Sequence, residues 1–228
     1  ALATEPTPSV RLNPLKMTTA KRESRKVEWS RWGYLLDARP SFTLDADFHA
    51  GAYYVQEASS QFAGYIISEA VGGSDACKGL RVLDMCAAPG GKSTQLRNKL
   101  GEKGVLVSNE IIPSRCKILT SNVERLGLKN TITTCMDSAK IARLYPKTFD
   151  FIMVDAPCSG EGMFRKEQIA IDEWSKENVE KCAARQKEIL ENASKCLKNG
   201  GYIVYATCTF SLEENEMLID EFLKTKLF

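Results

Sequence analysis

From residue 80 onward, short apolar runs alternate with longer stretches in which apolar residues recur at helical spacing. The short runs predict strands at 81–86, 105–110, 132–135, 149–155 and 201–207. Strands that alternate with helices in this way build β-α-β crossovers on a parallel sheet. The pattern therefore predicts an α/β domain with a mostly parallel sheet and helices on both of its faces.

The clearest helical stretch runs from about Lys176 to Lys198. The residues that return at helical spacing along it are Val179, Cys182, Gln186, Ile189, Ala193 and Cys196 or Leu197. Ser175 is placed to cap the start of this helix, and Asn199-Gly200 is placed to end it. Further helices are expected to start near Lys92 and near Ser138.

Length and composition predict one main domain, because 228 residues with 43% hydrophobic content can bury one sizeable core with room for a small appendage. Eight cysteines without Cys-x-x-Cys spacing and a single histidine argue against a zinc site and against a secreted disulfide framework. We therefore expect no metal, reduced thiols and a cytoplasmic protein.

No apolar run approaches the roughly 18 residues of a membrane span, and the first ten residues lack the apolar core of a signal peptide. We expect no membrane partner, and we expect a monomer. The chain starts at Ala1 rather than at methionine, which suggests that it begins partway into a longer protein.

Positive charge is concentrated near the N-terminus, although the net charge of the chain is only +2. Residues 1–40 contain eight Lys or Arg against four acids, and Trp29, Trp32 and Tyr34 lie among these charges. Cations neutralise phosphates and aromatic faces stack on bases, so this segment suits a nucleic-acid strand. The alternative is a solvated helix with ordinary surface lysines.

Ligands of such sheets bind beyond the carboxyl ends of the strands, so the residues that follow each strand are candidate site residues. The first predicted strand leads into a loop at Cys86, Ala87, Ala88, Pro89, Gly90, Gly91 and Lys92. Gly91-Lys92-Ser93 looks like the end of a P-loop, but Cys86 stands where a P-loop has its first glycine. Glycines let the backbone approach a ligand closely, although tight turns without a ligand are common.

Carboxylates end or follow three further strands at Glu110, Asp137 and Asp155. Three acids suit a nucleoside, whose hydroxyl and amino groups donate hydrogen bonds, better than a triphosphate. Glu110 lies roughly 20 residues beyond the glycines, where an acid can accept bonds from both ribose hydroxyls. A helix cap or a solvated turn is the alternative for a strand-end acid, and for Asp137 a cap on the helix near Ser138 is at least as good an interpretation.

Two cysteines, Cys158 and Cys208, also follow strands at this edge and are expected beside the same pocket. A disulfide between them is a competing interpretation, which the inferred reducing compartment disfavours. The other cysteines outside the loop are interpreted as small buried hydrophobic residues: Cys77, Cys116, Cys135, Cys182 and Cys196.

Three motifs, VLDMCAAPGGKSTQL, VDAPCSGEGMFRK and YATCTFSLEENE, resemble the Nop2/Sun family of RNA cytosine-5 methyltransferases. GEGMFRK is most similar to the bacterial branch that acts on small-subunit ribosomal RNA. Two further segments, 11–16 (RLNPLK) and 54–60 (YVQEASS), resemble the family's RNA-binding arm and the opening of its catalytic domain. The resemblance covers most of the chain.

The resemblance implies a Rossmann-like fold that binds S-adenosyl-L-methionine at Cys86 through Lys92. Glu110 is then expected on the ribose, Asp137 on the adenine, and Asp155 near the methionine end and the target base. It also implies that Cys208 is the nucleophile and that Cys158 assists product release.

The implied function is methylation of carbon 5 of cytosine in RNA, with 16S ribosomal RNA or the small ribosomal subunit as the expected partner. Transfer RNA is an alternative substrate, and a P-loop ATPase or a non-catalytic RNA-binding assembly factor is an alternative function. We expect an RNA-binding arm over residues 1–45 and a catalytic domain over residues 46–228. Because family members continue with further strands after the helix near 213–224, the C-terminal strands are expected to be missing from this chain.

Overall fold

The computed structural model describes residues 7–20 and 24–225. They divide into two compact units, one over Thr7–Cys135 and the other over the described residues from Met136 onward. Lys21, Arg22 and Glu23 of the basic segment lie outside the described residues, as does the segment 1–6. In the part of the chain that is described, no helix combines the length and the apolar character that crossing a membrane requires.

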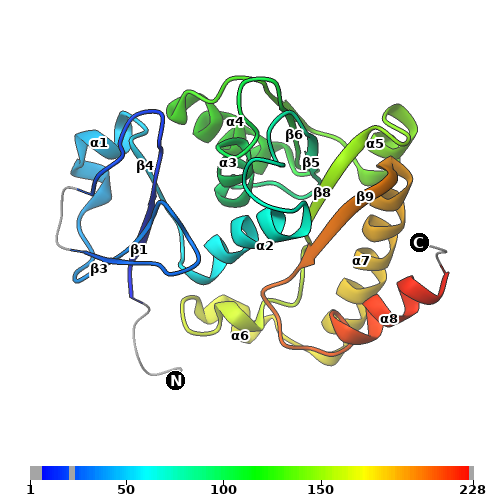
Figure 1. The fold of residues 1–228 in the computed structure, drawn as a ribbon. Coiled ribbons are helices and arrows are strands. Elements are labelled where there is room, and N and C mark those ends of the chain that lie inside the picture. The colour runs from blue at the N-terminus through cyan, green and yellow to red at the C-terminus, as the bar shows by residue number, and fades with distance from the viewer. Residues whose placement is uncertain (1–6, 21–23, 226–228) are drawn as a thin grey trace. The chain divides into compact units, whose positions relative to one another are not determined.

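The first unit begins with a four-stranded antiparallel sheet in the order β2-β3-β1-β4. Its strands are β1 (Ser9–Leu12), β2 (Ser24–Lys26), β3 (Gly33–Leu36) and β4 (Tyr53–Val55). Figure 1 labels β1, β3 and β4 of this sheet. The described part of the basic segment therefore forms strands and turns, and the interpretation as a solvated helix is wrong. The strands are short and lie in the part of the chain where hydrophobic periodicity is weakest.

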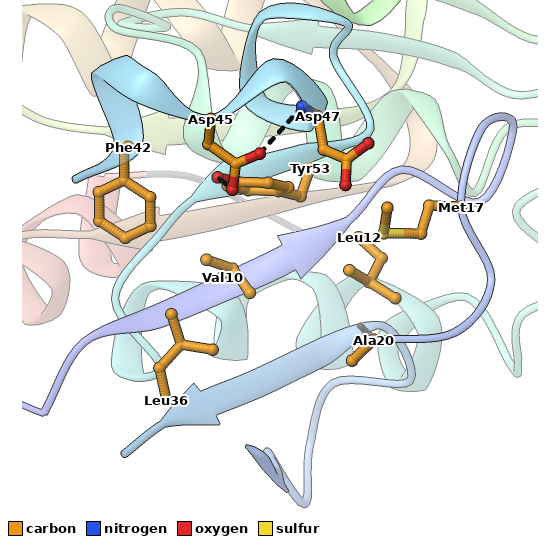
Figure 2. Close-up of a pocket in the computed structure, with 9 residues that line it drawn as sticks. All are labelled: Val10, Leu12, Met17, Ala20, Leu36, Phe42, Asp45, Asp47 and Tyr53. Atoms are coloured by element: carbon orange, nitrogen blue, oxygen red, sulfur yellow. Dashed lines mark hydrogen bonds between the residues drawn. The ribbon is translucent and has the colours of Figure 1, made fainter. Parts of the chain in front are cut away.

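Alternate side chains of β1 build the core of this small sheet. Val10 and Leu12 pack with Leu36 and Tyr53 on one face, under the helical turns η1 (Phe42–Leu44) and α1 (Ala46–His49). Figure 2 shows Asp45 at the upper edge of this cluster, where its carboxylate accepts the backbone N–H of Asp47 at 2.9 Å and so caps α1. Only a small apolar cavity of about 40 Å³ remains between these side chains.

The first unit continues with three parallel strands, β5, β6 and β7, in which β6 pairs with both of the others. Their bounds, and those of the helices around them, are β5 (Arg81–Asp84), β6 (Val105–Asn109), β7 (Thr131–Thr134), η2 (Ser59–Gln61), α2 (Phe62–Ala70), α3 (Gly91–Arg97) and α4 (Pro113–Leu126). Val82, Leu83 and Leu106 are fully buried, as expected for strands covered on both faces. β5 ends two residues before its predicted end.

Polar side chains tie the region of the small sheet to helix α4 within the first unit. Asn13 is fully buried and donates to the carbonyls of Gly51 and Leu126 at 3.0 and 2.8 Å. Arg125 of α4 donates to the carbonyl of Phe48 at 2.6 Å, and its guanidinium lies 4.3 Å from the Phe48 ring centre. The division at residue 45 stays a prediction.

The second unit contains two parallel strands, β8 and β9. Its elements are α5 (Ser138–Leu144), β8 (Phe149–Asp155), η3 (Glu161–Met163), α6 (Gln168–Asp172), α7 (Lys176–Cys196), β9 (Leu197–Ala206) and α8 (Glu216–Thr225). α5 and α8 both contact α7 (Figure 1). The Ser175 hydroxyl accepts the backbone N–H of Asn178 at 3.1 Å, which confirms the predicted cap of α7.

The predicted end of α7 at Asn199-Gly200 is wrong, because the helix ends at Cys196 and β9 starts at the next residue. The backbone N–H groups of Lys147 and Thr148 donate to the carbonyls of Lys195 and Cys196 at 2.9 and 2.8 Å. These bonds satisfy the last carbonyls of the helix, so it needs no glycine cap. Gly200 instead adopts a positive φ of 76° inside β9.

Candidate active site

The segment from Cys86 through Gly90 leads from β5 to α3, and Gly91 and Lys92 are the first two residues of that helix, so it starts within one residue of the predicted start near Lys92. Gly90 has a φ of 114° and directly precedes α3, and the Ala88–Pro89 peptide bond is cis. A side chain at Gly90 would be strained whatever space it had. The sequence pattern therefore located a real backbone constraint.

Neighbouring elements of the first unit hold this loop through its carbonyl groups. Arg115 and Asn122 of α4 each donate at 2.9 Å, to the carbonyls of Ala88 and Pro89 respectively. Arg11 of β1 donates to the carbonyl of Gly91 at 3.2 Å. The loop is thus fixed from two sides before any ligand binds.

Glu110 lies at the end of β6, where it is only 3% exposed. Its Oε1 accepts the backbone N–H of Ile112 at 3.0 Å, and its Oε2 lies 3.4 Å from a guanidinium nitrogen of Arg115. The carboxylate is therefore buried and held in one orientation. Its role on a ribose stays a prediction.

Asp137 caps α5, because its Oδ1 accepts the backbone N–H of Lys140 at 2.7 Å. The capping interpretation of this acid is confirmed. The side chain is exposed, and its predicted contact with adenine stays a prediction.

Cys158 and Cys208 come together in the second unit, although 50 positions separate them in sequence. Asp155 ends β8, Cys158 follows three residues later, and Cys208 lies just beyond β9. The two sulfurs are 3.2 Å apart, and the Cys208 N–H donates to the Cys158 sulfur at 3.4 Å. Disulfide sulfurs lie about 2.05 Å apart, and no disulfide joins cysteines within the described residues, so these two are thiols in contact.

The two thiols differ in their surroundings. Cys208 is exposed, whereas Cys158 is half-buried. The hydrogen bond with Cys208 and, after it, burial raise the pKa of the Cys158 thiol far above its usual range. Cys158 therefore stays protonated at neutral pH. Its S–H group can then donate a hydrogen bond to the sulfur of a Cys208 thiolate.

Glu214, which the sequence analysis did not single out, fixes the loop that carries Cys158. Its carboxylate is fully buried and accepts the Ser159 N–H at 3.0 Å and the Gln186 side-chain amide at 2.7 Å. Gln186 also donates to the carbonyl of Pro157 at 2.9 Å. A glutamine on the apolar face of a helix was the signal for this network, since buried amides require partners.

The Cys208 loop is joined to the Cys158 loop by further bonds. The hydroxyls of Ser159 and Thr209 are 2.9 Å apart, and the Gly162 N–H donates to the carbonyl of Cys208 at 2.7 Å. A Cβ at Gly162 would lie 2.5 Å from that carbonyl oxygen, so only glycine fits. These bonds between the two loops hold Cys158 and Cys208 in contact.

Family models match both parts of the chain. The model for 16S rRNA methyltransferase RsmB/F matches residues 76–227, and the model for the N-terminal domain of 16S rRNA methyltransferase RsmF matches residues 1–58. The family match argues against the P-loop ATPase hypothesis.

Curated relatives are similar along nearly the whole chain. Ribosomal RNA small subunit methyltransferase F of Vibrio cholerae is 39% identical over 92% of this chain and 46% of its own length. The protein of the same name from Aeromonas hydrophila is 38% identical over 94% of this chain and 47% of its own length. The chain thus spans about half the length of the curated relatives that it matches.

Solved structures confirm the predicted fold. A methyltransferase homolog from Pyrococcus horikoshii is 30% identical, covers 98% of this chain and 71% of its own, and has a TM-score of 0.79. PH0851 is 26% identical, covers 100% of this chain and 52% of its own, and has a TM-score of 0.89. The fold is the Rossmann-like fold of S-adenosylmethionine-dependent methyltransferases. The chain belongs to the RsmB/F family of 16S rRNA methyltransferases.

Proposed function

We propose that this protein transfers a methyl group from S-adenosyl-L-methionine to carbon 5 of cytosine in RNA, and that the RNA is 16S ribosomal RNA. The observation that carries the proposal is the contact of 3.2 Å between the Cys158 and Cys208 sulfurs. One thiol of the pair is exposed and the other retains its proton, which are the properties of a nucleophile and of its hydrogen-bond donor. Membership of the family supports the choice of substrate.

Two thiols suit this reaction because carbon 5 of cytosine is a poor nucleophile. The Cys208 thiolate adds to carbon 6, and the ring electrons then make carbon 5 nucleophilic enough to form a bond to a methyl carbon. S-adenosyl-L-methionine would supply that methyl group when it is bound, and loss of the methyl from its sulfonium would leave S-adenosyl-L-homocysteine. Transfer of the carbon 5 proton to a base then restores the ring, breaks the bond between carbon 6 and the Cys208 sulfur, and releases that sulfur as a thiolate.

We propose that Cys158 acts on the sulfur of Cys208, which it contacts at 3.2 Å. As a hydrogen-bond donor, Cys158 stabilises the negative charge on the Cys208 sulfur. This stabilisation acts before the sulfur adds to carbon 6 and again when it leaves carbon 6. Asp155, at the end of β8, is proposed to accept hydrogen bonds from the edge of the cytosine. These roles follow from the family resemblance, and the hydrogen bond between the thiols supports the first of them.

The residues around the β5–α3 loop fit the proposed cofactor. Gly90 and Gly91 leave the backbone without side chains at the start of α3, and the buried Glu110 offers carboxylate oxygens to a ribose diol. Asp137 is proposed to contact the adenine. Cys86 through Lys92 are proposed to line the cofactor, as in the family resemblance.

The expected partner is the small ribosomal subunit or its RNA, and transfer RNA is the alternative substrate. We propose that the protein acts in the cytoplasm as a monomer. The target cytosine must be unpaired or flipped, because the sulfur approaches carbon 6 from the face of the ring.

The test is denaturing electrophoresis of Cys158→Ala and Cys208→Ala proteins with labelled RNA and cofactor. We expect a trapped RNA adduct for Cys158→Ala, because the sulfur of Cys208 then leaves slowly, and none for Cys208→Ala. Cys135→Ala is the control, since it removes an exposed thiol from the other unit. An adduct for Cys208→Ala alone would reverse the two roles.

A further inference from the structure

A second cavity, of about 260 Å³, lies within the first unit and is lined by residues that no catalytic role uses. Its wall combines Trp29, Arg31 and Trp32 of the N-terminal segment with Lys78 and with residues of α3 and the turn that follows it. Its volume is slightly below the range of about 300–1,000 Å³ that drug-sized ligands occupy. The cavity therefore suits a small ligand or one residue of a polymer.

Positive charge dominates the lining of this cavity. Three cations, Arg31, Lys78 and Lys99, line it with a single acid, Asp75. Arg11 also lines it, but its guanidinium is buried and donates to neighbouring residues, among them Gly91 and Thr94. Asp75 pairs with Lys78 at 2.7 Å, and the pair is exposed. The balance favours an anionic ligand such as a phosphate.

Two indole rings line the same cavity. Trp29 is 37% exposed, and its Nε1 donates to the carbonyl of Ala58 at 2.7 Å, which fixes the orientation of the ring. The Arg31 guanidinium lies 5.1 Å from the centre of the Trp32 ring. Tryptophan faces next to guanidinium groups are the usual platform for stacking a nucleobase.

Two amide side chains, those of Gln95 and Asn98, complete the lining. Gln95 is 6% exposed, and its Oε1 is buried without a hydrogen-bond partner among the described residues. The side-chain nitrogen and oxygen of Asn98 are also buried without a hydrogen-bond partner among the described residues. These atoms have almost no accessible surface, so they lie behind the wall of the cavity, and the kind of ligand is inferred from the cations and indole rings of the lining.

We propose that this cavity binds one nucleotide of a single-stranded RNA, with its phosphate on Arg31, Lys78 and Lys99 and its base against Trp29. The identity of the strand as RNA rests on the proposed function. The cavity would hold the substrate at a point other than the reacting cytosine. A free nucleoside monophosphate carries the same chemistry and is the other possible source of the ligand.

The test measures binding by fluorescence anisotropy of a labelled ten-nucleotide RNA over a salt series, without cofactor. The pocket variant is Arg31→Ala with Lys78→Ala, since both side chains are exposed and their loss leaves the core intact. Lys103→Ala with Lys129→Ala removes the same charge from exposed positions of the same unit outside the cavity. We expect the pocket variant to bind the RNA about tenfold more weakly. The slope of log affinity against log salt concentration should fall in magnitude by about 1.4, because two cations are lost. Affinity and slope should change little in the control variant.

A second measurement distinguishes an RNA strand from a free nucleoside monophosphate as the ligand. Binding of unlabelled cytidine 5′-monophosphate is measured by quenching of tryptophan fluorescence. Binding of RNA but not of the monophosphate, lost in the pocket variant alone, supports the proposal. Equal, pocket-dependent binding of the monophosphate would keep the cavity as a nucleotide site but overturn the assignment to a strand. Equal weakening in both variants, or no binding by the wild type, would overturn the whole proposal.

A base-stacking variant tests the second half of the cavity. Trp29→Leu keeps an apolar side chain against Phe62 but removes the ring, and we expect RNA affinity to fall at least about fivefold with little change in the salt slope. Unchanged affinity would contradict stacking on Trp29. The two proposals can fail separately. If Cys158→Ala protein formed no covalent adduct but the cavity still bound RNA, the proposed reaction would be contradicted and the proposed RNA site would stand.

Discussion

At the scale of single residues, the proposed chemistry depends on how firmly the two thiols are held. The sequence predicted that Cys158 and Cys208 share one site, because both follow strands whose ends meet at one sheet edge. It did not predict Glu214, since an acid near the start of a helix is normally solvated. The prediction that Cys135 is buried is wrong, because it lies beyond the end of β7 and is exposed, and Cys116 is only half-buried.

Glu214→Ala is expected to lower the free energy of unfolding by about 2 kcal/mol, because the Ser159 N–H and the Gln186 amide lose their acceptor in a buried site. Urea denaturation measures this change. Glu214→Gln retains an acceptor oxygen and should cost less. Glu216→Gln, at an exposed position two residues later, is the matched control, and a loss as large as that of Glu214→Ala would contradict the role of the network.

Alkylation by iodoacetamide should distinguish the two thiols. The pKa of Cys158 is raised, so its thiolate forms only above the ordinary range of cysteine, and its alkylation should stay slow from pH 7 to pH 9. In Cys208→Ala the hydrogen bond that raises this pKa is gone, so alkylation of Cys158 should begin at lower pH. Peptide mass spectrometry across pH reads both rates. Faster labelling of Cys158 than of Cys208 at pH 7 would contradict the assignment.

At the scale of elements, the strands after residue 80 were predicted within a few residues because buried parallel strands are continuous apolar runs. The N-terminal sheet was not predicted. Its strands are short, and β1 places Arg11, which is 2% exposed, on the buried face opposite Val10 and Leu12. In a sequence, a buried arginine cannot be distinguished from an exposed one. The segment was therefore interpreted as a basic nucleic-acid-binding segment, and its strands were not predicted.

Asn13 should contribute more to the stability of the first unit than its size suggests. Asn13→Ala leaves the carbonyls of Gly51 and Leu126 without their donor, which is expected to cost about 1–3 kcal/mol of unfolding free energy. Asn13→Asp should cost more, because a carboxylate cannot donate and carries charge into a fully buried site. Thermal and urea unfolding would rank the two variants, and the opposite ranking would contradict this account.

At the scale of the whole molecule, the fold class was predicted from periodicity, and the family from three motifs. Neither pattern specifies the partners of Glu214, because Ser159 and Gln186 are distant in sequence and their contact depends on the tertiary course of loops. The division into an arm and a catalytic domain at residue 45 remains a prediction. In the structure, β4 lies beyond that boundary and pairs with β1.

Cofactor binding should stabilise the folded chain. If S-adenosyl-L-methionine binds only the native state, a concentration of 100 times its Kd adds about 2.7 kcal/mol to the free energy of unfolding. Thermal unfolding with and without the cofactor measures this, and ATP with magnesium is the control. Stabilisation by ATP instead would favour a P-loop function for the Gly91-Lys92-Ser93 segment.

The most direct test of the central claim is to identify the atom that carries the RNA. Cys158→Ala protein is incubated with RNA and cofactor, digested with nuclease and protease, and analysed by mass spectrometry. The account predicts a methylated cytidine nucleotide attached to the peptide that contains Cys208. Attachment to any other residue, or an equally abundant adduct in Cys208→Ala protein, would contradict it.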